Sequence, residues 1–188
     1  FTMELWGPIP LTPLRVSAHV VRPGRSVILA RAELVDVRRE RVVATAQVWL
    51  FPASSSGPGA PSGPLPHGPG DGVRHERPTT WGGGYLDAID WRWITGAVDR
   101  PGPGVVWMRS PDLVAGTAIS PVQRLLACVD SASGAGAALD VADWAFLNTD
   151  LTVHLLRPPV GEWVCLDART TLGPGSVGVA TCDVHDEL

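Results

Sequence analysis

Alternating apolar and polar residues predict a run of β-strands in the first fifty positions. The stretches LRVSAHVV (14–21), VILARAELVDV (27–37) and VVATAQVWLF (42–51) combine this alternation with many β-branched residues. RPGRS and the charged RRER lie between them and are typical of turns. The pattern predicts an antiparallel meander, in which neighbouring strands pair through short connections.

The second half of the chain carries further strand signals. AIDWRWITG (88–96) and VVWMRSP (105–111) are predicted as a strand pair on either side of a DRPGPG turn. Strand and turn patterns continue from residue 144 to residue 188. These segments predict a second antiparallel sheet.

One stretch, SPVQRLLACVDSASG (120–134), predicts a helix. Ser120 fits the N-cap, Pro121 fits the first helical position and Gly134 fits the C-terminal cap. The apolar residues spaced i, i+3, i+4, i+7 form one buried face: Val122, Leu125, Leu126 and Val129. One helix against antiparallel sheet predicts the α+β fold class.

The stretch NTDLTVHLLRPP (148–159) predicts a strand that ends at a double proline. Its polar side chains, Asp150, Thr152 and His154, would lie on one face, opposite the apolar ones. A partly buried carboxylate at the start of a strand can act as a general base on water, so Asp150 is a candidate catalytic residue. The alternative is an aspartate that only bonds the backbone. His154 is about 13 Å further along the strand, too far for a direct hydrogen bond to Asp150, and is interpreted as structural.

Residues 52–84 differ from the rest of the chain in composition. Seven prolines and nine glycines fall within these 33 positions, which argues against regular structure. We interpret the segment as a linker between two units. The predicted domains are therefore 1–51, the linker 52–84, and 85–188.

The two sides of this linker resemble each other. TMELWGP (2–8) is similar to TVHLLRP (152–158) at an offset of 150, and VVRPGRSV (20–27) is similar to TLGPGSV (171–177) at an offset of 151. We interpret them as two copies of one α+β unit. On this interpretation, 1–51 is the C-terminal part of the first copy, 85–188 is a second copy that lacks its last strand, and the chain is a fragment of a longer protein.

Composition excludes several function classes. All 15 basic residues are arginine, which excludes Schiff-base chemistry, a pyridoxal phosphate site and a Walker A loop. A net charge of -4 argues against a nucleic-acid partner, and no apolar run approaches the roughly 20 residues of a membrane helix. Three cysteines do not form a disulfide framework, which favours the cytoplasm. CDVH (182–185) offers only two ligands, so no metal site is predicted.

Three segments resemble the double hot-dog acyl-CoA thioesterases of the acyl-CoA thioesterase II type: SPVQRLLACVDSASG, NTDLTVHLLRPP and GEWVCLDARTT. The family motif is an Asp followed after six residues by Arg-Pro, which Asp150, Arg157 and Pro158 match. A Glu-Trp pair then opens the next strand and a Thr lies nine positions after the Glu, matched by Glu162, Trp163 and Thr171.

The resemblance implies a tandem hot-dog fold and hydrolysis of fatty acyl-CoA, without a cofactor. The family's Asp, Thr and Gln hold the attacking water, and Asp150 and Thr171 match the first two. The Gln lies in a last strand that this sequence does not contain. Backbone near Ser120 and Val122 is a candidate oxyanion site, because a helix N-terminus offers N–H donors.

Two alternatives remain open. One is a non-catalytic acyl-binding protein on the same fold, because a fold does not fix a function. The other is a hot-dog hydratase, for which His154 is badly placed. The acyl chain would run in an apolar pocket, between the helix and the sheet or along a subunit interface, so the interpretation is compatible with a homo-oligomer.

Overall fold

The computed structural model describes residues 1–52, 67–76, 83–175 and 177–188. They fall into two compact units, each described here by itself. Unit 1 contains the described residues of 1–61 together with 147–156, and unit 2 contains those of 62–146 together with 157–188.

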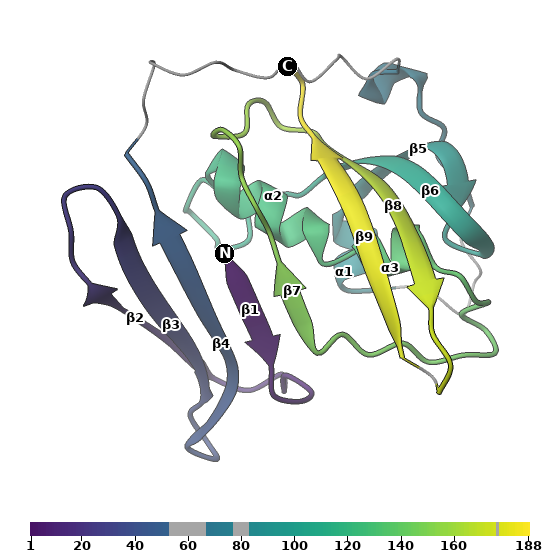
Figure 1. Ribbon diagram of the computed structural model, residues 1–188. Coiled ribbons are helices and arrows are strands. Elements are labelled where there is room, and N and C mark those ends of the chain that lie inside the picture. Colours follow the sequence, from purple (N-terminus) through teal and green to yellow (C-terminus); the bar gives the residue numbers. More distant parts are fainter. Residues whose placement is uncertain (53–66, 77–82, 176) are drawn as a thin grey trace. The chain divides into compact units, whose positions relative to one another are not determined.

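Unit 1 is a five-stranded antiparallel sheet in the order β2-β3-β4-β1-β7 (Figure 1). Its strands are β1 (Thr2–Leu5), β2 (Leu14–Arg22), β3 (Ile28–Asp36), β4 (Arg41–Leu50) and β7 (Asp150–Thr152). The predicted meander is confirmed by β2, β3 and β4, which pair in sequence order. The register places Val16, Leu34 and Ala44 in one cross-strand row and Ser17, Glu33 and Thr45 in the next, as alternation predicts.

β7 joins the first sheet, although the strand signal at 148–159 lies in the sequence range assigned to the second unit. It pairs with β1 in antiparallel register, with Thr2 opposite Thr152 and Glu4 opposite Asp150. β7 is shorter than the predicted strand at 148–159. Asp150 and Thr152 are exposed and Val153 is buried, as alternation predicts, but Leu155 of the predicted apolar face is exposed. Alternation shows which face a residue occupies but not which strand lies beside it.

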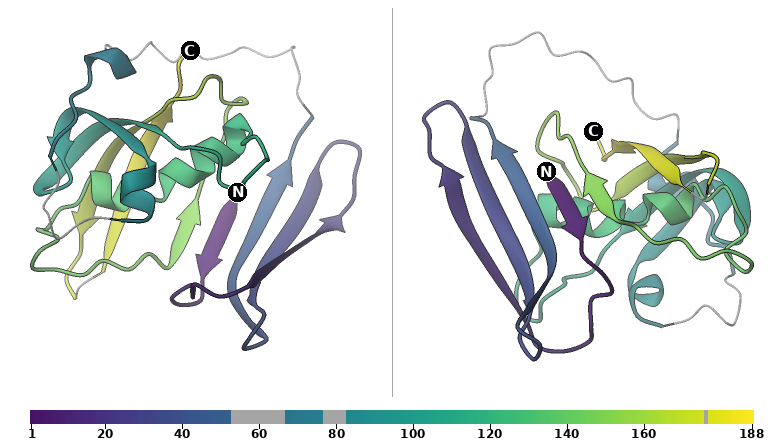
Figure 2. Two further views of the ribbon diagram at one scale, coloured as in Figure 1. Left: turned by 180° about the vertical axis from the view of Figure 1, so that it is seen from behind. Right: turned by 60° about the horizontal axis from the view of Figure 1, so that its bottom comes forward.

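Unit 2 contains a four-stranded antiparallel sheet in the order β5-β6-β8-β9 (Figures 1 and 2). Its strands are β5 (Asp90–Ala97), β6 (Arg100–Arg109), β8 (Val164–Leu172) and β9 (Gly178–His185). A short helix, α1 (Tyr85–Ala88), precedes β5. β6 begins inside the predicted DRPGPG turn, because the chain reverses at residues 98–99 and the Pro-Gly run extends along the strand.

The predicted helix appears as two pieces, α2 (Pro121–Val129) and α3 (Ala132–Ala135). Ser120 caps α2 as predicted, and its side chain accepts a hydrogen bond from the N–H of Gln123. The C-terminal cap is Gly136 rather than the predicted Gly134, which lies inside α3. Of the predicted buried face, Leu125 and Val129 are buried, whereas Val122 is exposed.

Helices α2 and α3 pack against β6 and β8 and form the core of unit 2. Two glycines permit the close approach of α3. A Cβ at Gly104 would collide with the carbonyl oxygen of Ala135, and one at Gly136 would lie 2.5 Å from the carbonyl carbon of Ala168. The buried residues around them include Met108, Leu125, Val129 and Leu166.

Part of the predicted linker has defined structure. Residues 67–76 contain a 3₁₀ turn, η1 (Pro69–Asp71), and an isolated bridge in which Val73 and Trp93 exchange backbone hydrogen bonds of 2.9 Å. The remainder of the predicted linker, apart from its ends, lies outside the described residues, and the domain boundaries stay predictions. No helix among the described residues is long and apolar enough to cross a membrane.

Candidate active site

Asp150 is the first residue of β7, and its backbone is fixed by pairing with β1. Phe1 and Val153 exchange both backbone hydrogen bonds, at 3.0 and 2.8 Å, and the N–H of Leu5 donates to the carbonyl of Thr149 at 2.9 Å. These bonds bracket Asp150, so its Cα position is set by the sheet rather than by a loop.

The Asp150 side chain is exposed, which differs from the partly buried carboxylate expected from the sequence. One carboxylate oxygen accepts a hydrogen bond of 3.1 Å from the hydroxyl of Thr149. The residue remains accessible to water and to a substrate.

Thr171 lies near the end of β8, opposite Val179 of β9, and its side chain is exposed. It belongs to unit 2, whereas Asp150 belongs to unit 1. The neighbouring Thr170 points its hydroxyl to the buried side, where that oxygen has no hydrogen-bond partner among the described residues. The role of Thr171 stays a prediction.

The candidate oxyanion region at the start of α2 is partly occupied by its own cap. The N–H of Ser120 donates to the side-chain oxygen of Gln123 at 2.9 Å, and the Ser120 hydroxyl oxygen accepts from the Gln123 N–H at 3.2 Å. This capping box uses the Ser120 donor. Pro121 has no N–H, so Val122 is the predicted backbone donor that remains.

The other motif residues hold the two final strands of unit 2 together. Arg157 forms a bidentate ion pair with Asp186, and the N–H of Val160 donates to the same carboxylate at 2.8 Å. Burial of Asp186 acts to raise its pKa, but the hydrogen bonds from Arg157 and from the backbone outweigh it and lower the pKa to about 2. Arg157 is therefore a structural residue.

Glu162 and Trp163 also have structural contacts. Their N–H groups both donate to one carboxylate oxygen of Glu187, at 2.9 and 2.8 Å. The Trp163 ring lies beneath the guanidinium groups of Arg92 and Arg109, which are 5.9 and 5.0 Å from its centroid. The motif thus positions the start of β8.

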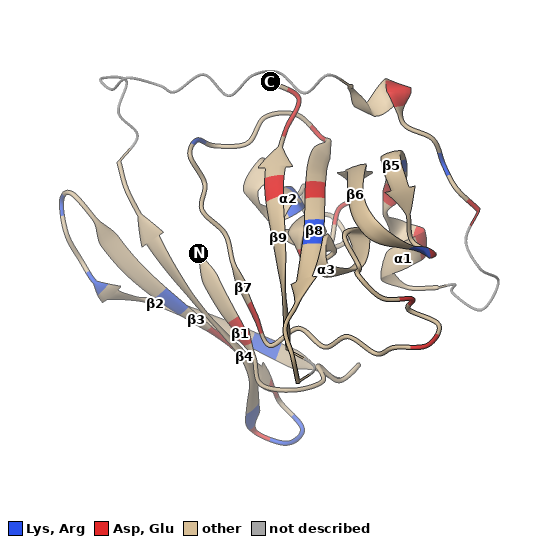
Figure 3. Ribbon diagram, turned by 45° about the vertical axis from the view of Figure 1, so that its right-hand side comes forward, with Lys and Arg blue, Asp and Glu red and all other residues tan. Residues whose placement is uncertain are grey.

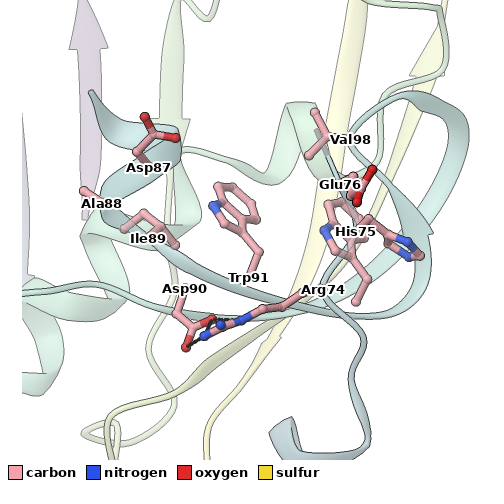
Figure 4. Close-up of a pocket in the computed structure, with 10 residues that line it drawn as sticks. Arg74, His75, Glu76, Asp87, Ala88, Ile89, Asp90, Trp91 and Val98 are labelled. Carbon is pink, nitrogen blue, oxygen red and sulfur yellow. Dashed lines mark hydrogen bonds and ion pairs between the residues drawn. The ribbon is translucent and has the colours of Figure 1, made fainter. Parts of the chain in front are cut away.

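A cavity of about 360 Å³ in unit 2 was not predicted from the sequence (Figure 4). Trp91, Trp93 and Ile89 supply its apolar lining, and charged residues that include Asp90 lie around it. Arg74 holds Asp90 with bonds of 2.8 Å, and Arg92 and Arg109 lie 3.4 and 3.5 Å from the same carboxylate. Three guanidinium groups thus surround Asp90, and its carboxylate oxygens are engaged in ion pairs within the fold.

Cysteine and histidine side chains do not assemble into a metal site within the described residues, where no group of three or more potential ligands is found. Cys128 lies on α2 and is fully buried in the core of unit 2. Burial raises the pKa of its thiol to about 12, which makes it a poor nucleophile.

Comparison with known proteins places both parts of the chain in one family. Residues 67–188 match the acyl-CoA thioesterase C-terminal domain, and residues 1–51 match the acyl-CoA thioesterase N-terminal domain. No curated protein matches the chain.

Solved structures show the same fold. A Thermobifida fusca YX protein named for thioesterase II superposes with a TM-score of 0.71 at 16% identity, covering 99% of this chain and 73% of that one. A conserved hot-dog protein from Alicyclobacillus acidocaldarius gives 0.68 at 18% identity, over 99% and 71% of the two chains. An acyl-CoA thioesterase II from Mycobacterium marinum gives 0.61 at 15%, over 99% and 73%.

These matches confirm the predicted α+β hot-dog fold and the predicted enzyme class, a thioester hydrolase. They do not test the individual site residues. The chain belongs to the acyl-CoA thioesterase family.

Proposed function

We propose that this protein hydrolyses fatty acyl-CoA to the free acid and CoA, using a water activated by Asp150. The observation that carries the proposal is the match of both 1–51 and 67–188 to acyl-CoA thioesterase domains. Asp150 is a carboxylate held by strand pairing and open to solvent. All three cysteines are free thiols, which supports a reducing compartment such as the cytoplasm.

In the proposed reaction, the water oxygen attacks the thioester carbonyl carbon while Asp150 takes a proton from that water. The carbon–sulfur bond then breaks, and the proton passes from Asp150 to the departing thiolate. Thr171 is proposed to orient the water. The N–H of Val122 is the proposed donor to the negatively charged oxygen of the intermediate.

The test is release of free CoA thiol from a panel of acyl-CoAs of different chain lengths, with wild type and Asp150→Asn. Loss of a general base is expected to lower kcat by about 10²–10⁴-fold. Asp99→Asn, which changes an exposed aspartate in the β5–β6 turn, is the matched control and should retain activity.

Two outcomes would contradict the proposal in different ways. Hydrolysis that persists in Asp150→Asn would show that another group activates the water. Binding of acyl-CoA with no hydrolysis at any chain length would favour the acyl-binding alternative.

A further inference from the structure

A second carboxylate faces Asp150 across the β1–β7 pair. The register places Glu4 of β1 directly opposite Asp150. Phe1 and Val153 form a hydrogen-bonded pair, with both backbone bonds made. Hydrogen-bonded and non-hydrogen-bonded pairs alternate in antiparallel sheet, so Glu4 and Asp150 form a non-hydrogen-bonded pair. In such pairs the Cα atoms are about 4.5 Å apart and the side chains are closest.

Placing two carboxylates opposite each other does not stabilise the fold. Like charges directly opposite each other destabilise a strand pair. Among the described residues, neither Glu4 nor Asp150 has an ion pair with an arginine or a histidine that would offset the repulsion. Local choices that work against the fold are expected at functional sites.

The neighbours of this carboxylate pair are polar. The hydroxyl of Thr45, opposite Glu4 on β4, donates to the Glu4 carboxylate at 3.2 Å. The hydroxyl of Thr149 donates to Asp150 at 3.1 Å. Each carboxylate is thus held by one hydroxyl and keeps acceptor capacity for a further donor. Figure 3 shows an acidic position on each of the two paired strands.

We propose that Glu4 is the second acceptor for the attacking water, so that the water is held between Glu4 and Asp150. This inference rests on the proposed hydrolysis. A water has two O–H donors, and two carboxylates on adjacent strands can accept both. One O–H donates to Glu4 and stays intact, while the proton of the other is transferred to Asp150. The water lone pairs then point away from the sheet, toward a thioester carbonyl.

The roles of the two residues differ in the reaction. Asp150 receives the proton and returns it to the departing thiolate, whereas Glu4 keeps its charge throughout and orients the water. A Glu4 substitution should therefore affect kcat and leave KM nearly unchanged, because Glu4 contacts the water and not the substrate.

The test is Glu4→Gln, which preserves length and retains an acceptor for Thr45. We expect kcat to fall by about 10- to 100-fold, the loss typical of one hydrogen bond to a charged group. We also expect Tm to rise by about 1–3 °C, because the like-charge repulsion is removed. A residue with a purely structural role would not give lower activity together with higher stability.

The matched control is Glu33→Gln. Glu33 lies on β3 opposite Thr45, in the same cross-strand row as Glu4 but two strands away. This variant changes the same charge on the same sheet face and should leave kcat within about twofold of wild type, since a charge two strands away contributes little to a local transition state.

Several outcomes would overturn the inference. Unchanged kcat in Glu4→Gln, with Asp150→Asn inactive, would remove Glu4 from the site and leave the proposed function intact. A fall in both kcat and Tm would make Glu4 structural, as would an equal loss in Glu33→Gln. Absence of hydrolysis by the wild-type protein would reject the proposed function itself, and the role of Glu4 with it.

Discussion

Unit 2 packs helices α2 and α3 against its sheet, whereas unit 1 consists only of strands among its described residues. Most described apolar residues that are fully buried lie in unit 2, including Val106, Met108, Cys165 and Leu166. In unit 1 the fully buried apolar side chains are few: Val43, Ala44 and Val153. β2 shows the same contrast, because all of its residues are exposed.

The contrast implies a different source of stability for each unit. In unit 2, burial of apolar surface contributes the largest favourable term. In unit 1, cross-strand pairing fixes the geometry, with less burial behind it. The proposed base and its facing glutamate lie in the second kind of environment, where a side chain can remain exposed while its backbone is held.

The largest expected effect comes from a core truncation in unit 2. Leu166→Ala removes a fully buried side chain from β8 and should lower the free energy of unfolding by about 2–5 kcal/mol. Leu34→Ala, at a half-buried site in β3, should cost less than half as much. Urea unfolding followed by circular dichroism measures both.

Thiol labelling can show whether the loss of stability in Leu166→Ala arises in unit 2, because unit 2 contains all three cysteines. Burial raises the pKa of Cys128, Cys165 and Cys182 to about 12, so labelling should be slow until unit 2 opens. Equal losses from Leu166→Ala and Leu34→Ala would show that the two units do not differ as described.

A smaller effect is expected where α3 meets β8. Gly136→Ala would place a Cβ 2.5 Å from the carbonyl carbon of Ala168 and 2.6 Å from the amide nitrogen of Arg169. Backbone cannot move aside as a side chain can, so we expect the free energy of unfolding to fall by about 1–3 kcal/mol. Gly134→Ala in the same helix meets no atom within 4 Å and should be neutral or stabilising. Thermal unfolding of the two variants tests this, and a similar loss in both would argue against close packing.

The smallest expected effect is a loss of stability at low pH, caused by protonation of Asp186. The pKa of Asp186 in the folded protein, about 2, lies below its ordinary value of 3.8. The ionised Asp186 therefore adds its full share to the free energy of unfolding above about pH 4, and this share is lost as the pH falls toward about 2. The loss amounts to about 2 kcal/mol at most. The slope of Tm against pH in this window should be shallower in Asp186→Asn. An unchanged slope would mean that other carboxyl groups determine the acid sensitivity.

The fold could largely be predicted from sequence where the signal is local. The meander follows from alternation, and the cap of α2 follows from Ser120 and Gln123 at capping-box spacing. The interruption between α2 and α3 was missed because Gly134 was interpreted as the C-terminal cap of one continuous helix, whereas it lies inside α3. The extent of β6 was missed because proline and glycine signals outweighed a strand that tertiary contacts stabilise.

The candidate site depended more on contacts between distant residues. The sequence indicated Asp150 and its facing, and the resemblance indicated Thr171. The sequence did not indicate Glu4, because the position of Glu4 opposite Asp150 arises from pairing between strands that are far apart in the sequence. Arg74 and Arg109 beside Asp90 were missed for the same reason, since they come from segments other than β5, which carries Asp90.

The pairing of β1 with β7 also has a consequence for the order of folding. Thr2 and Thr152, whose hydroxyl oxygens lie 3.4 Å apart, are separated by 150 residues in sequence. At a synthesis rate of about 5–20 residues per second, β7 is synthesised on the order of ten seconds after β1. Contacts between residues so distant in sequence form slowly, because a long loop must close before they can be made. The meander of β2, β3 and β4 can form during this interval, and the carboxylate pair is among the last features of the protein to assemble.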